Sequence, residues 1–137
     1  MRRKIILLAI AATSLVLATS GLAAGGKSSS NISLVVLSTS TLTASATSGP
    51  SQGDNVTFQV STDATDRPYV VLNCYQNGTW VYAASAGFYA AYRGSTTFGL
   101  ETTSWTAGAA DCTARLGSLS NSGRFTELAS LSFHVSE

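Results

Sequence analysis

Charged residues are scarce in this chain of 137 residues, where they make up 11% of the sequence against 45% for hydrophobic residues. Disordered chains are usually rich in charged residues and poor in apolar ones, so this composition excludes a wholly disordered chain. The apolar residues are numerous enough to form a hydrophobic core. Eight Lys and Arg residues accompany seven Asp and Glu residues, but three of the basic ones, at positions 2–4, precede the first apolar run. Setting those three aside leaves five basic against seven acidic residues, so no basic patch for nucleic acid is expected.

Histidine and cysteine are also rare, with one and two copies. His134 is the only imidazole that could act as a base, and no nucleophile-elbow sequence accompanies the many serines. We therefore interpret His134 as a surface residue and predict neither an enzyme nor a cofactor. The two thiols and one imidazole lack zinc-like spacing, and we interpret Asp54, Asp63 and Asp66 as turn formers rather than calcium ligands, so no metal site is predicted.

The N-terminus has the pattern of a secretory signal. Basic residues at 2–4 are followed by an apolar run from residue 5 to about 18 and then by small residues. This pattern predicts a signal peptide over residues 1–24, a flexible linker over 25–30, and a secreted or cell-surface location. An uncleaved anchor is the alternative, because residues 5–24 are long enough to span a bilayer core of about 30 Å. Polar interruptions and the small-residue exit favour cleavage, after which no membrane contact is expected.

Cys74 and Cys112 are the only cysteines, so they have no other partner in the chain. In an exported protein such a pair is usually oxidised, and we predict a disulfide. Closing a loop of 38 residues in this way contributes about 4 kcal/mol on the chain-entropy model. Two buried free thiols are the alternative.

From residue 31 onward, apolar and polar residues alternate with a period of two in short runs separated by turn residues, which is typical of antiparallel sheets. The expected strands lie at 33–37 and 42–46 (one split strand), 55–61, 69–76, 79–83, 95–100, 109–116 and 125–135. Asn77-Gly78 predicts a tight hairpin, whereas residues 84–94 fit no element. About seven strands and no amphipathic helix predict an all-β antiparallel sandwich over residues 31–137.

Three segments of the sequence are similar to strands of a known class of domain: 53–60 (GDNVTFQV), 71–78 (VLNCYQNG) and 108–116 (GAADCTARL). They resemble the second, third and sixth strands of bacterial secreted immunoglobulin-like domains. The resemblance implies an immunoglobulin-like β-sandwich that serves in display, spacing or binding. The chain departs from antibody-type domains in two ways: Cys74 falls on the third strand, so the disulfide would join neighbours in one sheet, and Ala110 stands where those domains have a tyrosine.

Aromatic residues gather around the expected hairpin and the unassigned stretch after it. One interpretation is a core with a capping loop, since a sandwich of this size buries several rings. The other is an exposed platform that stacks on sugar rings or docks a partner protein. The candidate ligand-binding residues on this second interpretation are Tyr75, Trp80, Tyr82, Tyr89 and Tyr92.

Three functions from different classes follow. The one we favour from the sequence is a secreted, non-catalytic immunoglobulin-like module for protein contact, adhesion or surface display, with a protein partner or self-association. The alternative is a carbohydrate-binding module that holds a polysaccharide on exposed aromatics around Trp80 and Tyr82. A small secreted enzyme or inhibitor would need a polar cleft with a perturbed titratable group, and the sequence contains no cluster of that kind.

Overall fold

The structure, a computed structural model, describes residues 28–37 and 49–137, and in these residues the chain forms strands and loops without a helix. The expected signal peptide at 1–24 and the second half of the split strand, at 42–46, lie outside the described residues. Within the described part of the chain, no helix is long and apolar enough to cross a membrane.

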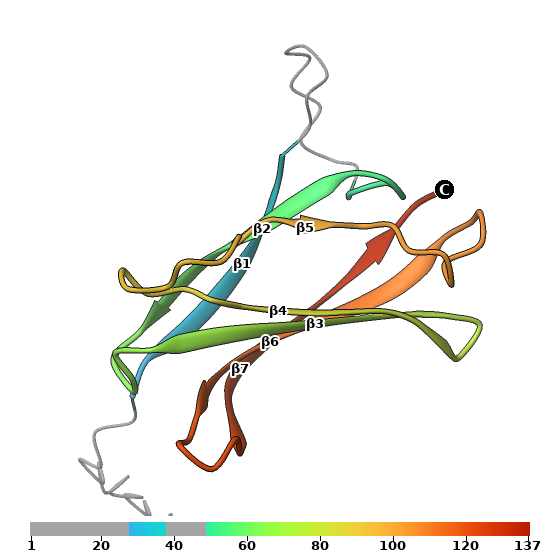
Figure 1. The fold of residues 1–137 in the computed structure, drawn as a ribbon. Coiled ribbons are helices and arrows are strands. Elements are labelled where there is room, and N and C mark those ends of the chain that lie inside the picture. The colour runs from blue at the N-terminus through green and yellow to red at the C-terminus, as the bar shows by residue number, and fades with distance from the viewer. Residues whose placement is uncertain (1–27, 38–48) are drawn as a thin grey trace, which may run out of the picture.

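Two antiparallel sheets make up the fold (Figure 1). The strands of the first sheet, in spatial order, are β1 (Ser30–Val36), β2 (Asn55–Thr62) and β5 (Phe98–Gly99). Those of the second are β4 (Thr79–Gly87), β3 (Pro68–Gln76), β6 (Ala110–Leu119) and β7 (Phe125–Val135). The chain therefore crosses between the sheets after β2, β4 and β5, and the predicted all-β sandwich is confirmed.

Several strand boundaries in the structure differ from those expected from the sequence. The expected strand at 95–100 shortens to the two residues of β5, and the expected linker at 25–30 loses Ser30 to β1. The unassigned stretch at 84–94 divides, because β4 runs on to Gly87 beside β3 before the chain leaves the sheet. Pairing with β3 extends β4, although its small residues alone give little strand signal.

The core lies between the two sheets, and the alternation of the strands determines its content. On β3 the inward side chains are Val70, Leu72 and Cys74, all fully buried. Phe58 of β2 belongs to the same core, and its ring centre is 6.3 Å from that of Phe133 on β7. Side chains from both inner faces thus form one continuous apolar core.

Cys74 and Cys112 form a disulfide inside this core. They are directly opposite each other on the neighbouring strands β3 and β6, with their Cα atoms 4.1 Å apart. Both residues are buried, and no free cysteine is present in the described residues. The bond therefore joins two strands of one sheet, as the position of Cys74 predicts, and does not link the two sheets as in antibody-type domains.

Candidate functional site

The five candidate aromatic residues do not form one platform. Tyr75 and Trp80 are 44% and 59% exposed beside the β3–β4 turn. Tyr82 is 8% exposed and points into the core. Tyr89 and Tyr92 contact Tyr69 at the other end of β3, which is about 20 Å away at the usual rise per residue. Of the two interpretations left open by the sequence, a single exposed platform of these five residues is therefore wrong, and among them only Tyr75 and Trp80 are freely exposed.

A β-bulge separates Trp80 from Tyr82. Cys74 pairs with Tyr82 and the next residue, Tyr75, pairs with Trp80, so Val81 has no partner on β3. In a regular strand, residues 80 and 82 share a face, but the extra residue reverses the alternation between them. As a result, Trp80 points outward beside Tyr75, whereas Val81 and Tyr82 are both buried.

Tyr82 is part of the buried core and contributes to packing. Its ring packs edge-on against the indole of Trp105, with the ring centres 6.3 Å apart. Trp105 is 4% exposed and donates from Nε1 to the carbonyl of Gly108 at 3.1 Å. Burial raises the pKa of the Tyr82 phenol above its usual value of 10.0. Trp105 was not among the sequence candidates, and it anchors the loop between β5 and β6 to the core.

Tyr69, Tyr89 and Tyr92 form a second aromatic cluster with a structural role. Their ring centres are 5.6 to 6.3 Å apart, all in edge-on contacts, and the hydroxyls of Tyr69 and Tyr89 lie 2.9 Å apart. This hydrogen bond raises the pKa of Tyr69. A Cβ on Gly87 would lie 2.5 Å from the Tyr89 ring, so a glycine is needed there for the rings to close. The cluster fixes the segment after β4 to the sheet.

Four side chains form a row across the outer face of the four-stranded sheet at the turn end. The register places Trp80 beside Tyr75, Tyr75 beside Asp111, and Asp111 beside His134. With strands about 4.8 Å apart, the row is about 14 Å long. Nδ1 of His134 lies 2.8 Å from Oδ1 of Asp111, and both side chains are exposed. We call these four residues the outer row.

The next positions along the same face carry small polar side chains. Asn73, Thr113 and Ser132 are neighbours on β3, β6 and β7, and the hydroxyls of Thr113 and Ser132 lie 3.2 Å apart. Ala83 of β4 completes the line. The two exposed rings therefore stand beside a shallow surface rich in hydrogen-bonding groups.

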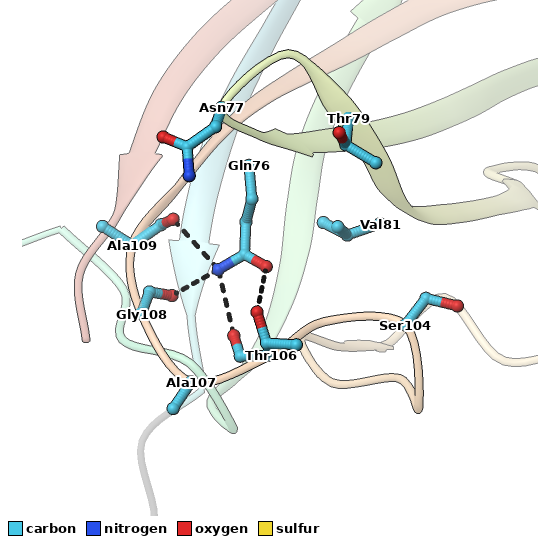
Figure 2. Close-up of a pocket in the computed structure, with 9 residues that line it drawn as sticks. All are labelled: Gln76, Asn77, Thr79, Val81, Ser104, Thr106, Ala107, Gly108 and Ala109. Carbon is cyan, nitrogen blue, oxygen red and sulfur yellow. Dashed lines mark hydrogen bonds between the residues drawn. The ribbon is translucent and has the colours of Figure 1, made fainter.

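A groove adjoins this face at the edge strand β4. It lies between the β3–β4 turn and the loop before β6 and has a volume of about 530 Å³ (Figure 2). Figure 2 shows Gln76 reaching from the end of β3 toward the loop. Its Nε2 donates to the carbonyls of Thr106, Gly108 and Ala109 at 3.0 to 3.3 Å, and its Oε1 accepts from Oγ1 of Thr106 at 3.2 Å.

Tyr75 and Trp80 of the outer row were sequence candidates, whereas Gln76, Asp111 and His134 were missed as binding positions. The alternation of β3 gives one signal for Gln76: it follows Val70, Leu72 and Cys74 in the inward series, so a polar residue occupies an apolar position. Nothing in the sequence pairs Asp111 with His134, because their contact depends on the register of β6 and β7.

The side chains of His134 and Asp54 each take part in a hydrogen bond. His134 bonds to Asp111, but no hydrogen bond joins it to a serine in the described part of the chain. Asp54 accepts from the amide of Ser51 at 2.8 Å, as a turn former does. Among residues 28–37 and 49–137, no group of three or more His, Cys, Asp or Glu side chains is placed to hold a metal.

Comparisons of the chain with protein-family models, with curated proteins and with solved structures gave no match. The immunoglobulin-like resemblance of the three strand segments therefore stays a prediction. Function has to be argued from the site alone.

Proposed function

We propose that this chain is an exported, non-catalytic binding module that holds a saccharide on the outer row. The observation that carries the proposal is the placement of two exposed rings, Tyr75 and Trp80, on adjacent strands in line with the Asp111–His134 pair. Export is supported by the disulfide between Cys74 and Cys112, because disulfides persist in oxidising compartments outside the cytosol.

The chemistry of the row suits a sugar. A pyranose has a face of C–H groups that packs on an aromatic ring, and hydroxyls around its rim that need hydrogen-bond partners. Tyr75 and Trp80 provide rigid apolar area, with a phenol hydroxyl and an indole N–H at the edges. Asp111 provides acceptors and His134 a ring nitrogen in the same line, so stacking and orientation come from one surface.

The size of the exposed aromatic surface also favours a small ligand over a protein. A stable protein interface buries about 800 Å² on each partner, with an apolar centre. Here the positions next to the two rings are the small and mostly polar Ala83, Asn73 and Thr113. The surface therefore matches the footprint of a few sugar units better than that of a protein.

Protein contact or self-association is the second candidate, and a different surface favours it. Val35, Val36 and Leu37, at and just beyond the end of β1, are each 37% to 39% exposed. Three consecutive exposed apolar side chains at the end of an edge strand are a site where another chain can pack. This candidate predicts an oligomer or a protein partner that is lost when these residues become polar.

Retention on insoluble polysaccharide tests the saccharide proposal. The exported chain should bind a neutral polysaccharide such as chitin or cellulose, and Trp80→Ala and Tyr75→Ala should each weaken retention at least tenfold, which corresponds to about 1.4 kcal/mol. Leu119→Ala is the matched control, because Leu119 is an exposed apolar residue at the far end of β6. Undiminished retention of Trp80→Ala would refute the proposal. Tyr82→Ala is unsuitable here because Tyr82 belongs to the core.

A further inference from the structure

The groove beside β4 continues the surface on which Trp80 stands. A second, smaller hollow runs along the same edge strand and has Trp80, Tyr82 and Thr102 among its walls. The hollow and the groove share Val81 and Ser104. A path therefore leads from the outer row, past Trp80 and over the edge of β4, into the groove.

The lining of the groove is polar and uncharged. Hydroxyls come from Thr79 and Ser104 and an amide from Asn77, whereas the amide of Gln76 and the hydroxyl of Thr106 already bond to each other and to the loop. Val81 and Ala107 add small apolar areas, and none of the described residues that line the groove is charged. Such a surface offers hydrogen bonds in several directions without attracting an ion, which suits a neutral polyhydroxylated ligand.

The wall of the groove is held rigidly. Besides the bonds from Gln76, the side chain of Gln52 donates to the carbonyl of Trp105 at 3.3 Å and accepts from the amide of Gly108 at 3.2 Å. Oγ1 of Thr102 donates to the carbonyl of Val81 at 2.7 Å, tying the loop to β4. A wall fixed before binding loses little entropy when a ligand arrives.

We infer that the groove is a second saccharide subsite, so that the module binds a chain of neutral sugars and not a single unit. This inference rests on the proposed function, because the path to the groove begins at Trp80. One sugar stacks on Trp80, and the next unit crosses the edge of β4 to meet Thr79 and Ser104. Affinity should therefore rise with the number of linked sugars.

Calorimetric titration with cello- and chito-oligosaccharides of one to six units tests the inference. Ser104→Trp fills the groove from an exposed loop position, and it should weaken binding of the longer oligomers about tenfold while changing that of the shortest ligands little. Thr103→Trp is the matched control, because Thr103 is the exposed neighbour on the same loop but does not line the groove. It should bind every length as the unaltered chain does.

The outcomes separate the two proposals. If Trp80→Ala loses binding at all lengths while Ser104→Trp binds every length normally, the outer row is the whole site and the groove inference is wrong. Equal affinity of the unaltered chain for short and long oligomers would overturn the inference in the same way. If the unaltered chain binds no oligomer of either series, the proposed function itself fails, and the inference fails with it.

Discussion

The disulfide between β3 and β6 permits the sharpest prediction about stability. Cys74 and Cys112 are 38 residues apart in sequence, so reducing the bond frees a loop of that length in the unfolded chain. The chain-entropy model gives a loss of about 4 kcal/mol. Domains of this size are stable by about 5–15 kcal/mol, so a large fraction of the total depends on one bond. At about 4–8 °C per kcal/mol for a domain of about 100 residues, the midpoint of thermal unfolding should fall by at least about 15 °C.

Urea unfolding followed by tryptophan fluorescence measures this loss, because Trp105 is buried and becomes exposed on unfolding. Two samples separate the crosslink from the packing of the sulfur atoms: the unaltered chain with a reducing agent, and the Cys74→Ala/Cys112→Ala double variant. Both should lose about 4 kcal/mol, and the double variant somewhat more because buried sulfur contacts disappear. A loss below about 1 kcal/mol in the reduced chain would show that the reasoning from loop length is wrong.

Three further predictions concern single residues. Gly117→Ala would place a Cβ 2.4 Å from the Phe125 ring and should destabilise the fold by about 1–3 kcal/mol in thermal denaturation, whereas Gly99→Ala, whose nearest contact is 3.3 Å, should cost much less. Because burial raises the pKa of Tyr82 in the folded chain, the phenol of the unfolded chain ionises first as the pH rises above 10. The free energy of unfolding should therefore decrease with rising pH until the pKa of the folded state is passed. Urea unfolding at several pH values should show a smaller decrease for Tyr82→Phe. Gln76→Ala removes four hydrogen bonds, so hydrogen exchange should become at least tenfold faster in the loop that it holds and stay unchanged elsewhere.

Local pattern was sufficient for most of the sandwich. The alternation of β3 and β6 placed Val70 and Leu72, and Ala114 and Leu116, on inward faces, and the structure buries all four. The turn at Asn77 was predictable for an equally local reason, since Asn77 and Gly78 adopt positive φ angles of 48° and 78°. In each case, the signal depends only on residues near one another in the chain.

Segments whose conformation depends on distant partners could not be predicted in the same way. The stretch after Gly87 carries Tyr89 and Tyr92, and its path is fixed by their contacts with Tyr69, about twenty residues earlier. The loop before β6 depends on Gln52 from the turn before β2 and on Gln76 from the end of β3. Neither set of contacts has a periodic signature, so both segments looked featureless in the sequence.

Because Val81 is unpaired, Trp80 points to the outer face of the sheet while Tyr82 points into the core. Without the bulge at Val81, the regular period of β4 would place Trp80 and Tyr82 on the same face, either both in the core or both exposed. Deleting Val81 should instead leave both side chains in place, because Trp80 and Tyr82 become neighbours in the chain and neighbours in a regular strand point to opposite faces. The pairing of Trp80 with Tyr75 is kept, so the deletion variant should still be retained on polysaccharide, whereas urea unfolding should show lower stability because the buried Val81 side chain is lost. Loss of retention in a deletion variant that still folds would show that this reasoning from the register is wrong.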